Sequence, residues 1–423
     1  MKRKFPILFV LLFVLAFCAE GFGAEASAKQ TICLNMIVKN ESKVITRCLE
    51  SILPMIDTWV IVDTGSTDGT QDIIQDYMAS KGVPGQLYER PWKNFGHNRS
   101  EALELARGTS DYVLIIDADE ILDYDPGFTV PELTMDFYYI MTHYSGMTYA
   151  RVQLINQSHL NWSWVGVLHE TVYCPEAHSV TTLEGVRNVV FTDGARSTDP
   201  LKFVKDAQVL EEALKEEPDN SRYVFYLAQS YRDAGMFEES LVNYQRRVKM
   251  GGWDQEIFWS MLQVACLQDW MNMPYETYST SYLKAYSYRP TRVEPLYHLM
   301  FALRHEEEYQ EGYEIGEVAI EVPLSKDILF LDNWIYDYGI LLEYSICAYW
   351  IGKYEECQKI SLQILAKPKI PNNVRECVEN NLGFANAKIL EARMAKRQAE
   401  KMAKKEQANK DSKTDKKNKS KKP

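Results

Sequence analysis

Short apolar runs alternate with amphipathic stretches through the first 120 residues, and this alternation restricts the possible folds more than any other feature of the chain. Three runs rich in Val, Ile and Leu have the length and composition of buried strands: 31–38 (TICLNMIV), 59–62 (WVIV) and 112–116 (YVLII). Residues 86–90 are expected to form a further strand, and helical spacing of apolar residues occurs at 44–52 and 100–106. Strands that alternate with helices predict a parallel α/β sheet.

Acidic side chains follow two of these runs where the strands are expected to end. Asp63 follows the second run, and Asp117 and Asp119 follow the run at 112–116. Ligands of such sheets bind beyond the carboxyl ends of the strands, so these residues are candidates for a binding site. Two carboxylates separated by one residue can reach one hard cation, Mg²⁺ or Mn²⁺, that bridges the diphosphate of a nucleotide sugar. The alternative is that they cap a helix beginning near Ile121.

The stretch from Asp63 to Thr70 (DTGSTDGT) has a local structural interpretation as well. It predicts an Asx turn followed by a helix for which Asp68 is the N-cap. This local role is compatible with ligand binding by Asp63.

The pattern becomes β-rich between Phe137 and Phe191, where FYYIM, YARVQLI and VRNVVF are the expected strands. We expect these strands to complete the sheet and to form the wall that faces the acceptor. Residues 161–170 (NWSWVGVLHE) lie between two of them. Trp162 and Trp164 in this stretch are expected either to stack on a sugar or acceptor, or to pack in the core.

After residue 200 the chain becomes helical and repetitive. Residues 223–250 place large and small side chains at the offsets of a tetratricopeptide helix hairpin, namely Leu227, Ala228, Tyr231, Ser240 and Tyr244. Residues 344–368 fit the same pattern, and weaker units cover 257–288 and 296–323. Recurring small residues let paired helices approach closely, which favours stacked repeats over an ordinary helical bundle.

Four motifs in sequence order, NMIVKNE, VIVDTGSTDGT, HNRSEAL and LIIDADE, resemble those of family 2 glycosyltransferases, which have the GT-A fold. The resemblance extends over roughly residues 31–196. It implies that Asp63 contacts the nucleobase, that Asn40 and Glu41 lie beside the nucleoside, and that Arg99 approaches the nucleotide. It also implies that Asp117 and Asp119 hold the ribose and the metal ion.

The stretch 162–170 resembles the acceptor-side element of family 2 enzymes that carry tetratricopeptide repeats. An inverting enzyme needs a general base to take a proton from the acceptor. Glu170 is the candidate base and His169 a candidate metal ligand or phosphate contact, while a structural role for the pair is the alternative. Asp193 is the rival base. Relatives often carry a metal-binding histidine near the position of Asp193, so the residue that completes the metal site stays open. Arg196 is expected to screen the diphosphate or to pair with Asp193.

Together these features predict a GT-A α/β domain at residues 29–200, followed by an all-α tetratricopeptide-like solenoid at 201–385 and a basic helical or disordered tail at 386–423. The architecture resembles that of sublancin-type peptide glycosyltransferases. The expected reaction is metal-dependent, inverting transfer of a hexose or N-acetylhexosamine from a UDP-sugar. The acceptor is expected to be a polypeptide held by the helical repeats, a saccharide or a lipid-linked group.

Two other functions compete with this interpretation. One is a binding protein in which an inactive transferase-like domain is carried on a tetratricopeptide scaffold; the intact Asp63, Asp117, Asp119 and Glu170 argue against it. The other is a nucleotidyltransferase, which is expected to have a glycine-rich loop with Lys or Arg after its first strand. The corresponding loop here, 39–42 (KNES), has no glycine.

Charge and the chain ends restrict partners and location. From Glu391 to Pro423 there are 13 Lys and Arg against 5 Asp and Glu, so this tail carries +8 and the remaining chain −20. An acidic body argues against nucleic acid as the main partner. Residues 1–26 combine a basic start, an apolar run and small residues, which predicts a signal peptide or an uncleaved membrane anchor. The expected location is a secretory-pathway lumen or an exported, periplasmic site.

The seven cysteines after Cys18 show no C-x-x-C pair. Their number and spacing indicate neither a zinc site nor a dense disulfide framework. We expect most of them to be buried free thiols.

Overall fold

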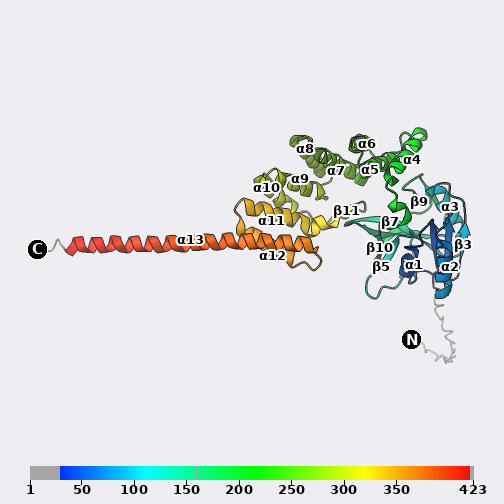
Figure 1. The fold of residues 1–423 in the computed structure, drawn as a ribbon, viewed down its shortest axis with the longest axis horizontal. Coiled ribbons are helices and arrows are strands. Elements are labelled where there is room, and N and C mark those ends of the chain that lie inside the picture. The colour runs from blue at the N-terminus through cyan, green and yellow to red at the C-terminus, as the bar shows by residue number, and fades with distance from the viewer. Residues whose placement is uncertain (1–28, 159–160, 420–423) are drawn as a thin grey trace, which may run out of the picture.

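A computed structural model describes residues 29–158 and 161–419, with side chains described through residue 407 (Figure 1). The predicted signal segment at 1–26 lies outside the described residues. The described chain comprises an α/β half, a helical half and a long terminal helix (Figure 1). None of the described helices is long and apolar enough to cross a membrane.

Among the described residues, nine strands form one mixed sheet in the order β3-β2-β1-β4-β7-β6-β10-β5, with β11 paired to β7. The strands are β1 (Ile32–Val38), β2 (Thr58–Asp63), β3 (Gly85–Glu89), β4 (Tyr112–Ile115), β5 (Glu120–Tyr124), β6 (Phe137–Tyr144), β7 (Met147–Asn156), β10 (Val180–Val190) and β11 (Leu331–Asp332). A separate hairpin joins β8 (Ser163–Val165) to β9 (Thr171–Tyr173).

The parallel α/β prediction is confirmed for β3, β2, β1 and β4, which run parallel to one another. Helices α1 (Ile45–Ile52) and α2 (Thr70–Lys81) cover one face, and α3 (Phe95–Leu105) covers the other. Alternate side chains of β1 enter these two cores, as Leu34 and Cys33 illustrate. Burial on both faces explains why the strands read as continuous apolar runs.

Two local predictions at the strand ends are wrong. Glu120–Tyr124 is a strand that pairs with β10, so Asp117 and Asp119 cap no helix near Ile121. The N-cap of α2 is Gly69, in a left-handed conformation with φ 86°, rather than Asp68. The Asp68 carboxylate instead accepts hydrogen bonds from the backbone amides of Ser42 and Thr70, and thereby ties the loop after β1 to the loop after β2.

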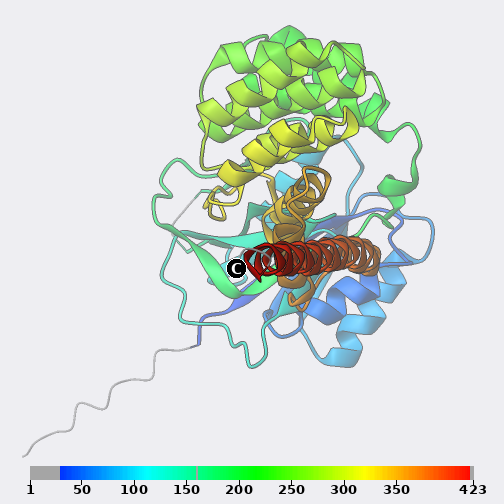
Figure 2. The ribbon, with the colours of Figure 1, turned by 90° about the vertical axis from the view of Figure 1, so that its left-hand side faces the viewer.

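The predicted series of helix hairpins is confirmed in the helical half, where α5 packs on α6, α7 on α8, α9 on α10 and α11 on α12 (Figure 2). The helices are α4 (Lys202–Glu216), α5 (Ser221–Asp233), α6 (Phe237–Met250), α7 (Asp254–Trp270), α8 (Tyr275–Tyr288), α9 (Glu294–His305), α10 (Tyr309–Ala319), α11 (Ile340–Trp350) and α12 (Tyr354–Leu365). Short helical turns occupy Ala195–Thr198 and Ile335–Gly339.

The terminal helix α13 (Asn372–Lys419) packs on α12 and then continues far beyond the body of the molecule (Figure 1). Every side chain from residue 390 to residue 407 is exposed. As far as residue 419, the predicted tail beginning at residue 386 forms part of one continuous helix. The cysteine prediction also holds, because Cys377 is exposed and the other six described cysteines are buried free thiols.

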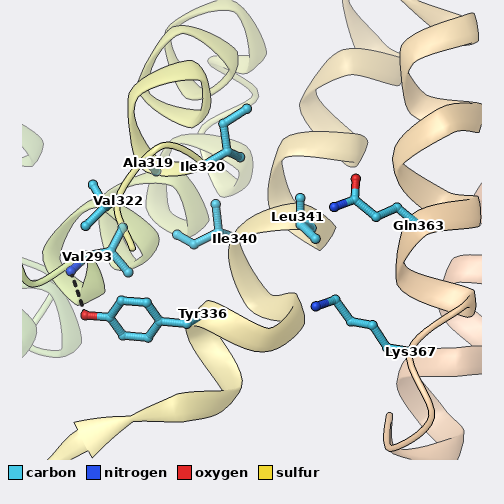
Figure 3. A pocket seen from close by; sticks show the side chains of 9 residues that line it. All are labelled: Val293, Ala319, Ile320, Val322, Tyr336, Ile340, Leu341, Gln363 and Lys367. Atoms are coloured by element: carbon cyan, nitrogen blue, oxygen red, sulfur yellow. Dashed lines mark hydrogen bonds between the residues drawn. The ribbon is translucent and has the colours of Figure 1, made fainter. Parts of the chain in front are cut away.

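A cavity of about 180 Å³ lies between the later repeats (Figure 3). Most of its lining residues are apolar, and Gln363 and Lys367 extend toward it from α12 and the turn that follows. Its lining residues are Val293, Ala319, Ile320, Val322, Tyr336, Ile340, Leu341, Gln363 and Lys367. None of them belongs to the strands at the acidic edge of the sheet.

The helical half departs from the all-α prediction in one segment, which joins it to the sheet. We call residues 327–334 the junction segment. Its strand β11 pairs with the start of β7, and the Ala150 amide donates to the Ile328 carbonyl at 2.8 Å. The ring of Phe330 contacts Tyr149 of β7 and Trp259 of α7, with centroids 5.5 and 5.0 Å apart. The two halves therefore share apolar contacts and backbone pairing.

A buried ion cluster holds the junction segment from the helical side. Arg292 and Glu294 have fully buried side chains and pair at 2.8 Å. Arg292 also pairs with Asp327 at 3.2 Å and donates to the carbonyls of Leu329 and Phe330 at 3.1 and 2.7 Å. Buried charges are costly unless they are paired and hydrogen-bonded, and here the guanidinium meets both conditions.

We expect Arg292→Met to lower the free energy of unfolding by about 3–5 kcal/mol, because it leaves the Glu294 carboxylate buried without its guanidinium. Urea unfolding followed by tryptophan fluorescence measures the effect. Arg107→Met is the matched control, because the Arg107–Glu104 pair is exposed and of a kind worth about 0–1 kcal/mol. Equal losses in the two variants would contradict a structural role for the buried cluster.

Candidate active site

The nucleobase candidate Asp63 lies buried at the end of β2. One carboxylate oxygen accepts from the backbone amides of Gly65 and Ser66, both at 2.8 Å, and from the Gln71 amide at 3.2 Å. The other oxygen, Oδ2, is buried and has no hydrogen-bond partner within the described part of the chain. A buried acceptor without a donor is costly, so this oxygen is suited to a donor group on a ligand.

Asn40 and Glu41 form the loop after β1 and contact two neighbouring segments. The Asn40 side chain accepts from the Thr67 amide at 2.8 Å, and the Glu41 carboxylate accepts from the Ala195 amide at 3.2 Å. Burial, with the nearby charge of Asp119, raises the pKa of Glu41 to about 7. The loop thus places a carboxyl group among other acids at the carboxyl edge of the sheet.

A continuous chain of ion pairs crosses the site. Arg99 of α3 contacts Glu170 through Nε and Asp117 through Nη2, both at 2.6 Å. Arg151 of β7 contacts the other Asp117 oxygen at 3.4 Å and also pairs with Glu120. Burial alone would raise the pKa of Asp117, but the two guanidinium groups outweigh it and hold the pKa well below its usual range. The structure therefore brings Glu170, Arg99 and Asp117 together.

Sequence reasoning missed Arg151 and Glu120 as members of this group. Glu120 follows the acidic motif directly, and Arg151 interrupts the apolar run YARVQLI. A charge within a strand that otherwise reads as buried was the available signal, because such charges are rare unless paired. The partner of Arg151 lies about thirty positions away in the sequence, so only the sheet shows the pairing.

Asp119 stands apart from the two guanidinium groups. Burial raises its pKa, and the neighbouring Asp117 carboxylate adds to the effect. Its Oδ2 lies 2.6 Å from where a Cβ on Gly194 would stand, so a glycine at 194 is required for this close approach. Among the described residues, no three His, Cys, Asp or Glu side chains are placed to hold a metal ion by themselves.

Two glycines bring Glu170 to Arg99. A Cβ on Gly96, in the first turn of α3, would lie 2.6 Å from the carbonyl oxygen of Gly166. Gly166 has φ 111°, a conformation that side chains rarely adopt, and a Cβ there would lie 3.3 Å from the Glu170 Cα. The loop 166–170 therefore packs directly on the start of the helix that carries Arg99.

His169 is surrounded by cations rather than by the acidic group. Part of its surface is exposed to solvent, but the crowding of neighbouring atoms around the imidazole lowers its pKa, and the charges of Arg196, Arg222 and Lys202 lower it further. Its ring stacks on Tyr226 of α5 with centroids 4.1 Å apart and an interplanar angle of 11°. These neighbours suit a phosphate contact better than metal binding, because cations nearby repel a metal ion and attract an anion.

Asp193 and Arg196 bind different partners from those expected. Asp193 pairs with Arg47 of α1 through two hydrogen bonds of 2.8 Å, and about half of its side chain is exposed. Arg196 pairs with Asp206 of α4, and its guanidinium lies 4.5 Å from the centre of the Phe95 ring. The expected alternative of an Arg196–Asp193 pair is therefore wrong.

The two tryptophans of the acceptor-side stretch have different environments. Trp162 is buried against Phe137, and its Nε1 donates to the Asn156 carbonyl at 2.6 Å, so the core-packing interpretation holds for it. Trp164 lies under the Arg99 guanidinium, 5.1 Å from the ring centre. Its Nε1 is buried and has no partner within the described residues. Trp164 is thus part of the wall around the ion-pair chain.

Four parallel strands with acidic groups at their carboxyl ends define an α/β protein with a candidate ligand site at this edge. The family model "Glycosyl transferase family 2" matches residues 33–126, from the second residue of β1 to the end of β5. Residues 33–126 therefore match a family 2 glycosyltransferase domain, and this region is joined to the helix hairpins described above.

Curated relatives agree with this domain. The chain is 26% identical over 232 residues to the SPbeta prophage-derived glycosyltransferase SunS of Bacillus subtilis, which covers 52% of this chain and 53% of that protein. It is 36% identical over 98 residues to the lipopolysaccharide core biosynthesis glycosyltransferase LpsC of Rhizobium meliloti, covering 23% of this chain and 35% of that protein. The chain thus spans about half the length of the first of these relatives and less of the second.

Among solved structures, a tetratricopeptide repeat protein from Parabacteroides merdae aligns with a TM-score of 0.35 and 16% identity. The alignment covers 46% of this chain and 73% of that one.

We expect Gly96→Ala to disturb the site, because the added methyl group would overlap the Gly166 carbonyl and push loop 166–170 away from α3. Such overpacking lowers the free energy of unfolding by about 1–3 kcal/mol. Thermal unfolding checks this, and Gly383→Ala in α13 is the control because a Cβ there meets open space. A Gly96→Ala protein as stable as this control would contradict the close approach.

Proposed function

We propose that this protein is a metal-dependent, inverting glycosyltransferase that uses a UDP-sugar donor. One observation carries the proposal, namely the chain of contacts that joins Glu170 to Asp117 through Arg99. A candidate base and a candidate metal ligand thereby contact two nitrogens of one guanidinium at the carboxyl edge of the sheet. A transferase needs this proximity, because the acceptor proton is removed while charge develops on the leaving diphosphate.

The donor is bound by residues from the loops after β1 and β2. The unpartnered Oδ2 of Asp63 accepts an N–H of the nucleobase, which satisfies a buried polar atom. Asn40 and Glu41 line the same edge and contact the nucleoside. Arg99 faces the phosphates. So do Arg196 and Lys202, which are cations that lie near His169.

Asp117 and Asp119 would hold the metal ion, whereas His169, the further candidate from the sequence, lies among cations and would contact a phosphate instead. Carboxylate oxygens are the ligands that Mg²⁺ and Mn²⁺ prefer. Partial burial raises the pKa values of Asp119 and Glu41, and repulsion by neighbouring carboxylates adds to the effect; a cation relieves this repulsion. When bound, the ion neutralises charge on the leaving diphosphate.

Glu170 is the stronger candidate for the base. Its side chain is 8% exposed, and Arg99, which lies over the Trp164 ring, fixes its orientation. Asp193 is half-exposed and already bound by Arg47 through both oxygens. A group that is fixed near the reacting atoms makes the better base.

The acceptor is a polypeptide held by the helical repeats, or alternatively a saccharide or lipid-linked group. Repeats of this kind present extended surfaces that suit an extended chain. The N-terminal segment directs the protein to a secretory lumen or an exported, periplasmic location, as a cleaved signal or a membrane anchor. The acidic body disfavours nucleic acid as a partner.

A second candidate function is nucleotide-dependent binding without catalysis. The commitment of both Asp117 oxygens to guanidinium groups favours it, because a metal ion must compete with those contacts. Donor hydrolysis separates the two functions. A binding protein is retained on immobilised UDP with Mn²⁺ but hydrolyses no UDP-sugar.

For the metal, we expect Asp119→Asn to lower hydrolysis of the preferred UDP-sugar by roughly 100-fold or more, since it removes one anionic ligand. The assay measures released UDP with Mn²⁺, with Mg²⁺ and with excess EDTA. Asp123→Asn is the control, because Asp123 of β5 is half-exposed and pairs with Arg187 of β10. Undiminished hydrolysis in EDTA would rule out the metal.

For the base, we expect Glu170→Gln to lower transfer by roughly 10²–10⁴-fold while the affinity for UDP stays nearly constant. The amide oxygen keeps a hydrogen bond to Arg99, so the loop is expected to stay in place. Transfer and calorimetric UDP binding are measured together, with Asp193→Asn as the matched variant. A larger loss of transfer in Asp193→Asn than in Glu170→Gln would reverse the two roles.

A further inference from the structure

Helix α5 of the helical half reaches the candidate base through one neighbouring residue, His169. The imidazole lies flat on the Tyr226 ring, and the His169 carbonyl accepts two hydrogen bonds from Arg222, at 2.8 and 3.2 Å. Both contacts fall on the residue that directly precedes Glu170. Helix α5 therefore touches the same backbone segment that carries the candidate base.

The segment needs this support, because His169 has φ 51°. A residue other than glycine in this left-handed region is held against its own preference and persists only where surrounding contacts fix it. The ring stack and the carbonyl hydrogen bonds act on opposite ends of the residue, its side chain and its peptide group. Together they fix the direction in which the chain enters Glu170.

Arg222 and Tyr226 form one unit on α5. They are four positions apart and so lie on the same side of the helix. The Arg222 guanidinium lies 4.9 Å from the centre of the Tyr226 ring and 3.4 Å from its hydroxyl oxygen. It also approaches Glu256 of α7 at 3.9 Å, and Glu256 pairs with the fully buried Arg247. The unit is thereby anchored in the interior of the repeats.

We infer that Arg222 and Tyr226 are positioning residues that hold Glu170 in contact with Arg99 by fixing His169. The inference rests on the proposed role of Glu170 as base, and it assigns part of the active site to the helical repeats. The ring face of Tyr226 and the guanidinium of Arg222 carry the effect, whereas the Tyr226 hydroxyl is dispensable.

The test uses the full chain with Tyr226→Leu, Arg222→Met and Tyr226→Phe. Hydrogen–deuterium exchange of residues 166–172 is measured against residues 112–115 of β4, together with kcat and KM for UDP-sugar hydrolysis. We expect Tyr226→Leu and Arg222→Met to speed exchange in 166–172 alone and to lower kcat roughly 10- to 100-fold, with KM nearly unchanged, because misplacing a catalytic group costs rates of this order. Tyr226→Phe keeps the stack and is expected to match the unaltered protein.

Two matched controls remove similar contacts elsewhere. Tyr309→Leu removes a tyrosine stacked on Trp350 at 5.2 Å, and Arg246→Met removes an arginine that donates to the Pro218 carbonyl. Neither is expected to alter exchange in 166–172. If Tyr226→Leu fails to fold, Arg222→Met decides the question. The Arg222 side chain is one-third exposed, so its replacement is expected to leave the protein folded.

Unchanged hydrogen exchange of residues 166–172 in the folded variants would overturn the inference. Faster exchange in these residues without a fall in kcat below that of the control variants would overturn it as well. If the unaltered protein hydrolyses no UDP-sugar, the proposed function fails. The exchange result then still decides whether α5 holds loop 166–170.

Discussion

The architecture of the site depends on one guanidinium. Arg99 has an 11% exposed side chain and binds Asp117 from the end of β4 and Glu170 from loop 166–170, both at 2.6 Å. Removing a guanidinium from water is costly unless carboxylates pair with it, and here two carboxylates contact it. Three segments far apart in sequence are thus fixed relative to one another by a single side chain on α3. Gly96, one turn earlier, permits the approach of the loop.

Two of the contacts between the helical half and the α/β half lead directly to this site. The junction segment pairs with the start of β7, the strand that carries Arg151 and through it Asp117 and Glu120. Helix α5 contacts His169, which precedes Glu170. Each of these connections combines a backbone contact with an aromatic contact. The repeats and the carboxyl edge of the sheet are therefore packed against each other and are not independent domains joined by a linker.

Charges of opposite sign lie side by side at this edge. Glu41 and Asp119 have raised pKa values because they are buried among other acids. Lys202 has a lowered pKa because it is partly buried and lies near Arg196, while Asp119 acts in the opposite direction. A metal ion with a diphosphate would reduce both repulsions, because the cation would pair with the acidic side chains and the phosphates with the basic ones. This electrostatic pattern agrees with the family 2 domain found from the sequence.

The amino-acid sequence by itself determined the parallel sheet, the helix hairpins and the acidic residues Asp63, Asp117 and Asp119, because local periodicity and strand-end position encode them. Tertiary structure alone decided the partners. Arg151 meets Glu120 only because β7 lies beside β4, and Asp193 meets Arg47 rather than Arg196 across a separation of 146 positions. The strand at Leu331–Asp332 had no readable pattern, since two residues carry no period and its pairing depends on an exposed edge of β7. Contacts between distant segments are set by packing and charge neutralisation, which no local pattern records.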